Sequence, residues 1–399
     1  MTRPRPHLFA RSRFAKVCDR LIETVWDRGW DEKPSLDPDY LWTLASKGYS
    51  EEDEYSIRSS EDVEDFRLRL ERLCASLREE AALNSLGHTM AYGQLRNAIR
   101  KRHALGRLWR ERPKLASTPI APPIIVLGQM RSGTTRVQRL FDADPKLAGT
   151  RFCDSHDPVP SRPDLRPLKA RAALFMARRV NPWLDTFHPF GATQTDEEIG
   201  WLSAALSPAA FEAQWRIPSY VAFNEGHDQT PVYREFARML RTDAATAENA
   251  EKPRVLKCQQ FAEDAKALLD QFPDAKVVRC TRAQDEVHAS SVSMVASQMA
   301  YQSERHMLAD LEAEWARKID HRERRLDQAL ESFSGPVAEI RFEDLNADSV
   351  AAMASVYKAL DMPFDRSARD CMKAEIEEAG RSPHRMHREQ IEHLLPETG

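Results

Sequence analysis

The chain changes its hydrophobic pattern near residue 118. Before this point apolar residues recur at helical spacing, and Phe66, Leu70, Leu73 and Leu77 lie at i, i+4, i+7 and i+11. After it, short runs rich in β-branched residues alternate with helical patterns. Such alternation is typical of βαβ units. We therefore predict an α/β fold with a parallel sheet flanked by helices, divided into an N-terminal helical region at 1–118 and an α/β domain at 119–399.

The predicted sheet is built from short strands with helices between them. Strands are expected at 124–127, 254–258, 275–281 and 337–342. Helices are expected at 136–141, 262–272 and 285–294. Proline clusters in the segment 156–167, which predicts a surface excursion rather than a strand. Residues 168–186 then show the pattern of a helix with an apolar face, which suits either core packing or the wall of a binding site.

Composition narrows the class of protein. A chain of 399 residues with 42% hydrophobic content can bury a large core. It has no apolar run of about 18 residues and no apolar segment behind its first residues, so no integral membrane segment is predicted and a cytoplasmic location is expected. The six cysteines lack CxxC pairs, which suits a reducing compartment and gives no metal signature. The net charge of -4 argues against nucleic acid as a partner.

Two basic segments qualify this picture. Residues 8–26 form a basic amphipathic stretch that suggests contact with a membrane surface, but Asp19 and Glu23 interrupt the basic face and favour a packed helix. Residues 96–114 are dense in arginine and could contact RNA or an acidic surface. Few aromatic residues interleave with these charges, so a solvated helix face with its apolar residues inward is favoured.

The most informative segment is Pro122 to Thr135, with the sequence PPIIVLGQMRSGTT, in which an apolar strand enters a loop that ends in two threonines. The helix that follows would aim the backbone N–H groups of the loop at an anion. Gly128 and Gly133 keep the spacing of a nucleoside triphosphatase loop, but Thr134 takes the position of its lysine. Arg131 supplies the positive charge instead. A single 5′-phosphate with one further anionic group therefore fits better than a triphosphate.

The pattern RSGTT after an apolar strand resembles the 5′-phosphosulfate loop of sulfotransferases, which use 3′-phosphoadenosine 5′-phosphosulfate (PAPS) as donor. The similarity extends from about 34 to 363, and to a tail at 383–387, and it is to the bacterial family related to tyrosylprotein sulfotransferases. It implies a P-loop-type α/β fold. It also implies that one set of adjacent residues binds the 5′-phosphosulfate: Arg131, Ser132, Gly133, Thr134 and Thr135.

The same resemblance supplies the other end of the donor site. Family members place an arginine at a strand end and a serine eight residues later, and both bind the 3′-phosphate; RAQDEVHAS gives Arg282 and Ser290 these positions. Guanidinium and hydroxyl groups are suitable donors to phosphate. A family lysine in a KSP-like motif corresponds to Lys257, although the next residues here are cysteine and glutamine. Lys257 and Arg131 are thus expected to stabilise charge on the transferring group.

Sulfuryl transfer also needs a base for the acceptor hydroxyl. Counting from Asp144-Pro145, the position of the family glutamate falls on Asp154, which is the predicted general base. Its neighbours His156 and Asp157 are alternatives, and His188 is the second candidate because the unperturbed pKa of histidine lies near neutrality. The acidic run 196–198 would ordinarily cap a helix N-terminus.

We therefore predict a PAPS-dependent sulfotransferase that needs no metal. The acceptor stays open among small molecules, lipids, carbohydrates and peptides, and a homodimer is also left open. One rival is a nucleotide kinase or triphosphatase with a degenerate loop, against which Thr134 argues. The other is a non-catalytic, nucleotide-binding relative of sulfotransferases, because Asp154 and the altered KSP motif depart from the family pattern.

Overall fold

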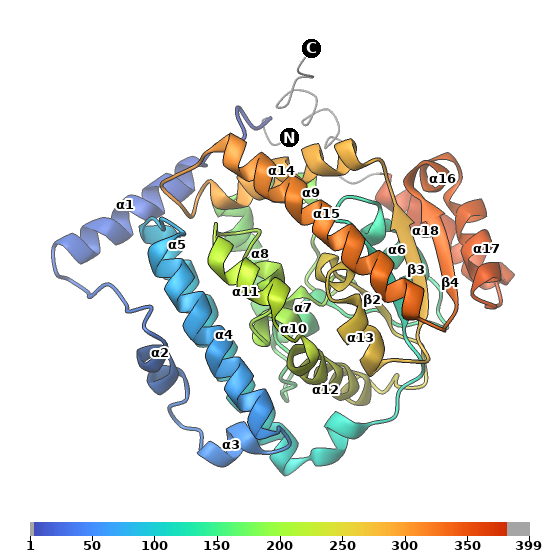
Figure 1. Ribbon diagram of the computed structural model, residues 1–399, viewed down its shortest axis with the longest axis horizontal. Helices are drawn as coiled ribbons and strands as arrows, with labels where there is room; N and C mark the ends of the chain where they lie inside the picture. The colour runs from blue at the N-terminus through green and yellow to red at the C-terminus, as the bar shows by residue number, and fades with distance from the viewer. Residues whose placement is uncertain (1–3, 381–399) are drawn as a thin grey trace.

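The computed structural model describes residues 4–380 and contains a parallel sheet with the strand order β2-β1-β3-β4, which lies in the right half of the view in Figure 1. Val126 on β1 is in register with Lys257 on β2 and with Val278 on β3. Because all pairs are parallel, the carboxyl ends of the strands meet at one edge of the sheet. The strands are β1 (Ile124–Gly128), β2 (Val255–Lys257), β3 (Lys276–Thr281) and β4 (Val337–Arg341).

Helices precede the sheet, connect its strands and follow it. Those before β1 are α1 (Arg13–Asp27), α2 (Pro38–Ala45), α3 (Glu51–Tyr55), α4 (Ser60–Glu79), α5 (Ser85–Glu111) and the short 3₁₀ helix η1 (Pro113–Ser117). Those between β1 and β2 are α6 (Thr134–Asp142), α7 (Phe152–His156), α8 (Arg166–Val180), α9 (Leu184–Phe187), α10 (Ile199–Ala204), η2 (Pro208–Ala210), α11 (Pro218–Gly226) and α12 (Thr230–Thr246). Those after β2 are η3 (Gln259–Ala262), α13 (Ala265–Gln271), α14 (Gln284–Met299), α15 (Leu308–Ser332), α16 (Phe342–Ala347), α17 (Ser349–Ala359) and α18 (Arg366–Ala379).

The sheet divides the core into two layers. Side chains alternate along a strand, so Ile125 and Leu127 face one side and Ile124 and Val126 face the other. The first pair packs in a cluster with α12 and α13, and the second pair packs with α6 and α17. All of β1 is buried, as expected for a central parallel strand covered on both faces.

The N-terminal helices begin at polar caps and pack on their apolar faces. Ser59 caps α4, and Asn84 caps α5 by accepting a hydrogen bond of 2.7 Å from the amide of Gly87. The apolar face of α4 joins a cluster that includes Phe211 and Trp215, which come from the segment after η2. The N-terminal helical region and the later chain therefore share one hydrophobic cluster.

The predicted strands are all present, and so are the predicted helices apart from 168–186, within a few residues at their ends. The arginine-rich segment 96–114 lies largely in α5 with its leucines and isoleucine buried, as predicted. The predicted helix 168–186 is divided between α8 and α9, because the chain leaves the helix at Asn181 before Pro182. The tail at 383–387, which entered the resemblance, lies outside the described residues.

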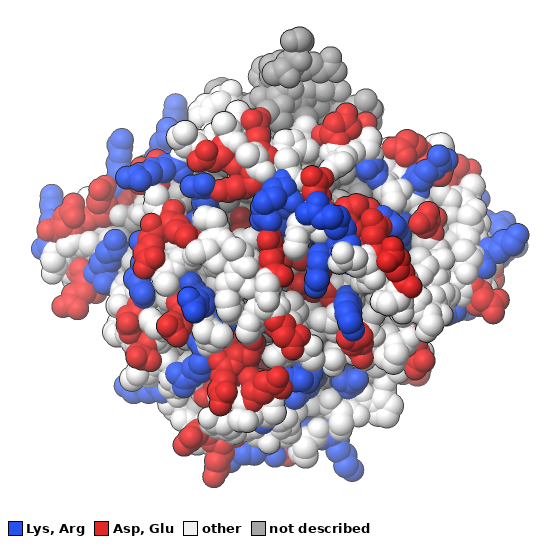
Figure 2. Space-filling view, viewed as in Figure 1, with Lys and Arg blue, Asp and Glu red and all other residues white. Residues whose placement is uncertain are grey.

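Acidic and basic side chains are intermixed over the face that carries α15 (Figure 2). Within residues 4–380, no helix is long and apolar enough to cross a membrane. The division at residue 118 and the cytoplasmic location stay predictions.

Candidate functional site

The loop between β1 and α6 is shaped by residues with left-handed backbone conformations. Gly128 has φ +147°, and a Cβ atom there would lie 2.5 Å from the carbonyl oxygen of Cys280 on β3, so only glycine allows this approach of the strands. Gly133 has φ +89° and caps α6. Arg131 has φ 69°, which is uncommon for a residue with a side chain. The first amides of α6 lack helical acceptors and open toward the loop.

The structure brings together the two predicted halves of the donor site. Arg131 donates from Nε to Ser290 Oγ at 2.9 Å and from Nη1 to the carbonyl of Phe187 at 2.7 Å. Arg282 donates from Nη1 to the carbonyl oxygen of Arg131 at 2.8 Å. The loop after β1 and the strand–helix junction after β3 are thus in direct contact, because both lie at the carboxyl edge of the sheet.

Two guanidinium groups share this edge. Arg282 forms an ion pair with Glu286 and lies 4.0 Å from the ring centroid of Phe342, the first residue of α16. Burial and the nearby charge of Arg282 lower the pKa of Arg131 to about 10. Glu286 is one anion at this edge. A further anion between the two guanidinium groups would reduce the repulsion between them.

Lys257 completes the positive side of the site. It ends β2, its side chain is buried, and its Nζ donates to Thr135 Oγ1 at 3.0 Å. The same Nζ forms an ion pair with Glu197. Lys257 therefore contacts the second threonine of the loop.

The acidic run 196–198 has contacts of its own and does not cap α10 through its side chains. Asp196 accepts from His188 Nε2 at 2.8 Å and from the Glu197 amide at 2.7 Å. Burial favours a higher pKa for Asp196, but the charge of His188 and these hydrogen bonds outweigh it and lower the pKa. Glu198 is fully buried, and its Oε2 accepts a hydrogen bond from the Lys257 amide at 2.8 Å.

Sequence reasoning did not select Glu197, although the acidic run next to His188 was a signal for it. His188, Asp196 and Glu197 each offer a ligand atom, and these atoms lie within 4.8 Å of one another, so the group could hold a cation. The ammonium of Lys257 already contacts the Glu197 carboxylate and supplies that positive charge. The prediction that no metal is needed stays a prediction.

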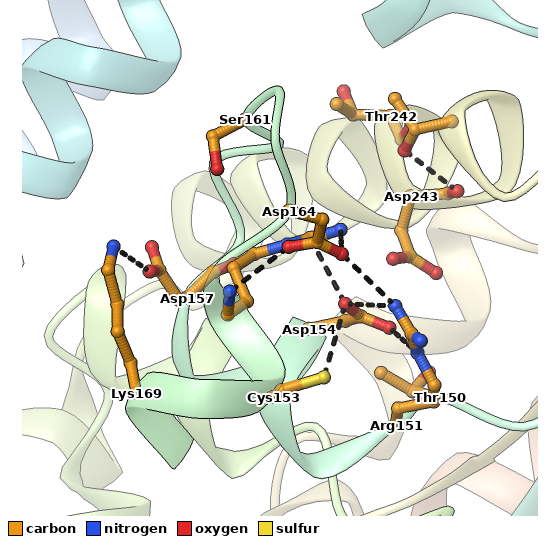
Figure 3. Close-up of polar contacts among 12 residues, drawn as sticks. Thr150, Arg151, Cys153, Asp154, Asp157, Ser161, Asp164, Lys169, Thr242 and Asp243 are labelled. Carbon is orange, nitrogen blue, oxygen red and sulfur yellow. Dashed lines mark hydrogen bonds and ion pairs between the residues drawn. The ribbon is translucent and has the colours of Figure 1, made fainter. Parts of the chain in front are cut away.

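Asp154 lies on α7 in an arginine cluster of its own (Figure 3). Its carboxylate accepts from Arg151 at 2.5 Å and 3.0 Å, and Arg166 Nη1 lies 3.1 Å from Oδ1. Among residues 4–380, the contacts of the Asp154 carboxylate are to these arginines and to Cys153, and none is to Lys257. Nearby, Asp157 pairs with Lys169 of α8 at 3.1 Å.

A cavity of about 590 Å³ lies beside α7. The Phe152 ring lines it and packs on Phe190 with ring centroids 5.8 Å apart, and Phe190 packs on His188 at 4.5 Å. This row of rings runs from the wall of the cavity to His188, which contacts Asp196. Basic residues of α5 and α8 line much of the remaining wall, together with one acidic residue, Asp157; the basic residues are Arg100, Lys101, Arg166 and Lys169.

Comparison with known proteins identifies related chains. A model of a family described as "Sulfotransferase family" matches residues 122–366. The crystal structure of sulfotransferase STF1 from Mycobacterium tuberculosis H37Rv is similar, with a TM-score of 0.75 and 25% identity over 91% of this chain and 100% of that chain. That of sulfotransferase STF9 from Mycobacterium avium has a TM-score of 0.77 and 18% identity over 88% of this chain and 90% of that one. No curated protein sequence gives a significant match.

Proposed function

This chain belongs to the sulfotransferase family, and from that premise we propose that it transfers a sulfuryl group from PAPS to a hydroxyl or amine of an acceptor. The observation that carries the choice of donor is the contact of Arg131 with both Ser290 and Arg282. Two basic side chains and a hydroxyl group from distant parts of the chain suit a nucleotide with phosphate groups at both its 5′ and 3′ positions. The lowered pKa of Arg131 indicates that an anion would stabilise this arrangement.

In this proposal PAPS supplies the sulfuryl group, and the residues of the chain hold its two ends. The loop residues bind the 5′-phosphosulfate: Arg131, Ser132, Gly133, Thr134 and Thr135. Arg282 and Ser290 bind the 3′-phosphate. The acceptor oxygen forms a bond to sulfur as the bond from sulfur to the 5′-phosphate oxygen breaks, and Lys257 and Arg131 stabilise the charge that develops on the leaving phosphate.

The acceptor proton needs a base close to Lys257. We propose Glu197 for this role, because its carboxylate contacts Lys257, which in turn contacts Thr135 of the loop. Asp154, predicted from its position in the sequence, is held by Arg151 and Arg166 and would have to leave both to accept the proton. His188 contacts Asp196 and is the further candidate.

The cavity beside α7 is the proposed acceptor site. Its volume of about 590 Å³ is typical of pockets that bind small ligands. Its row of aromatic rings leads toward His188, and its basic wall favours an acceptor that carries an anionic group. The identity of that acceptor stays open among small molecules, lipids, carbohydrates and peptides.

Calorimetry tests the donor assignment. We expect 3′-phosphoadenosine 5′-phosphate to bind more tightly than ATP or GTP, and Arg282→Ala to weaken its binding by at least about tenfold. Adenosine 5′-phosphate, which lacks the 3′-phosphate, should lose much less affinity in the same variant. Preference for ATP would contradict the sulfotransferase proposal and favour a kinase or triphosphatase, and equal losses for both nucleotides would contradict the 3′-phosphate assignment alone.

A further inference from the structure

Helix α8 carries apolar side chains on two opposite sides. Its inner side packs Ala170 and Leu174 against Phe152. Large apolar side chains on its outer side stay exposed, although a large apolar helix face normally packs against a partner. Within the described residues, no other part of the chain buries these apolar side chains on the outer side. The exposed side chains are Leu165 at 48%, Leu168 at 64%, Phe175 at 57% and Met176 at 49%.

The outer residues of α8 form one stripe. Positions 165, 168, 175 and 176 fall on one face at 3.6 residues per turn, and the small side chain of Ala172 lies between them. We call these five residues the outer stripe of α8. Single exposed apolar residues are common, but a contiguous apolar face on a helix usually marks an interaction surface.

The charges on α8 indicate what kind of surface covers the stripe. The helix contains no acidic residue, and its basic residues are Arg166, Lys169, Arg171, Arg178 and Arg179. Arg171 and Arg178 flank one side of the stripe and Lys169 flanks the other. Arg179 falls on the same face as the stripe, at its C-terminal end, and its guanidinium lies over the Phe175 ring, 5.1 Å from its centroid. An apolar stripe with basic margins matches the acyl and headgroup regions of an anionic lipid surface.

A second copy of the chain fits this surface less well. A two-fold contact through the stripe would place its basic margins against identical basic margins. Two of the three basic residues at the margins already have acidic partners. Lys169 pairs with Asp157 at 3.1 Å, and Arg178 pairs with Asp185 at 2.7 Å. These pairs are partly exposed, and exposed ion pairs exchange partners at little cost.

The start of α1 lies beside the end of α8. Ser12, which caps α1, donates to the carbonyl of Val180 at the end of α8 at 2.8 Å. On α1 the side chains of Val17 and Leu21 are 54% and 61% exposed. The basic residues Arg13, Lys16 and Arg20 accompany them. The stretch 8–26, for which the sequence favoured a packed helix, thus has one packed side and one exposed apolar side.

We propose that the outer stripe of α8 docks the protein on an anionic lipid surface. Leu168, Phe175 and Met176 would enter the boundary between headgroups and acyl chains, and the basic margins would contact anionic headgroups. Lys169 lies both at the margin of the stripe and in the wall of the cavity beside α7. A docked molecule would therefore hold this cavity next to the lipid headgroups.

Sedimentation of the full chain with lipid vesicles tests the proposal, and it needs no donor nucleotide. We expect the protein to sediment with vesicles of phosphatidylcholine mixed with phosphatidylglycerol and much less with phosphatidylcholine alone. The double substitution Leu168→Ser with Phe175→Ser should lower the partition coefficient at least about tenfold, because two apolar side chains no longer leave water. Arg171→Gln should lower it about fivefold on the anionic vesicles, and added salt should reduce that difference.

Matched controls use exposed residues on other elements. Val337→Ser on β4 removes an exposed apolar side chain, and Lys266→Gln on α13 removes an exposed positive charge. Both should bind the vesicles as the unchanged protein does. Thermal unfolding of each variant excludes loss of the fold as the cause of weaker binding.

Three results would overturn the proposal. The first is no binding to anionic vesicles, and the second is equal binding by the unchanged protein and the α8 double variant. The third is a dimer in sedimentation velocity that becomes a monomer in the double variant, which would assign the stripe to a second copy of the chain. None of these results depends on sulfuryl transfer, so a failure here and a failure of the proposed function are distinguishable.

Discussion

At the scale of single residues, Glu198 illustrates how burial sets a protonation state. Its side chain is buried beneath the site and accepts a hydrogen bond from the Lys257 amide at 2.8 Å. Burial raises the pKa of Glu198 to about 8, although the hydrogen bond from Lys257 acts in the opposite direction. The carboxyl group is thus protonated at neutral pH in the folded protein and ionised in the unfolded chain.

This difference predicts a dependence of stability on pH. The folded state binds the extra proton between the ordinary pKa of 4.5 and about 8, so the free energy of unfolding should fall as the pH rises through this range. Glu198→Gln removes the titrating group and should flatten that fall. Urea unfolding of both proteins across the range measures it, and parallel curves for the two proteins would contradict the assignment.

The choice of base gives a second prediction at this scale. Glu197→Gln should lower kcat by at least about 100-fold while 3′-phosphoadenosine 5′-phosphate still binds, because a general base contributes about 10² to 10⁴. Asp154→Asn should lower stability by weakening the pairs with Arg151 and Arg166 and should lower kcat much less. Turnover with labelled PAPS against fractionated extract acceptors measures both. The opposite ranking would return the role to Asp154.

The sequence could predict the positions of those site residues that lie at the ends of strands. Arg131, Lys257 and Arg282 follow or end parallel strands, so the topology alone brings them to one edge. Glu197 and Asp154 lie in segments without strands, where orientation depends on tertiary contacts. Ser155, for example, donates to the Glu197 carbonyl at 2.7 Å and thereby joins α7 to the acidic run. No local pattern in the sequence encodes that contact.

At the scale of elements, α5 carries three glycines, and two of them, Gly93 and Gly106, have opposite surroundings. A Cβ at Gly106 would lie 1.5 Å from the Asp53 carbonyl oxygen, so this glycine allows α3 to pack against α5. A Cβ at Gly93 would meet nothing within 4 Å. Helical periodicity predicted the helix and its buried face correctly, but it could not distinguish these positions, because both occupy ordinary helical turns.

This contrast gives a prediction within one helix. Gly106→Ala should lower the free energy of unfolding by about 1–3 kcal/mol or more, because α3 must move away. Gly93→Ala should raise it by about 0.5–1 kcal/mol, since alanine has the higher helix propensity. Chemical denaturation measures both values. Stabilisation by both substitutions would contradict the close approach of α3 to α5 at Gly106.

At the scale of the whole molecule, buried ion pairs join the N-terminal helices to the helices that cover the sheet. Arg58, which lies between α3 and α4, pairs with Glu235 of α12 and also donates to the carbonyl of Arg102 at 3.0 Å. Burial would raise the pKa of Glu235, but Arg58 and its neighbours outweigh burial and lower it to about 2. The contribution of this carboxylate to stability is therefore present above pH 4.5 and is lost as the pH falls toward about 2.

Removing one partner should affect the molecule as a unit. Arg58→Met leaves the charge of the buried Glu235 carboxylate without its main basic partner. This substitution should lower the free energy of unfolding by about 3–5 kcal/mol. Arg341→Gln, which breaks the exposed pair with Asp344, should leave the free energy of unfolding nearly unchanged. We expect one calorimetric transition in both variants, because the regions on either side of residue 118 share a hydrophobic cluster. Two separate transitions in the unchanged protein would show that these regions unfold independently.

The hydrogen bond from Arg282 to the Arg131 carbonyl has a kinetic consequence for the proposed reaction. A nucleotide that engages Arg282 also orders the loop that holds its other end, so occupancy of one end favours occupancy of the other. The spent nucleotide retains both phosphates and should be held about as firmly as the donor. Its departure would then limit the rate of turnover, and the spent nucleotide would act as a strong competitive inhibitor with respect to the donor.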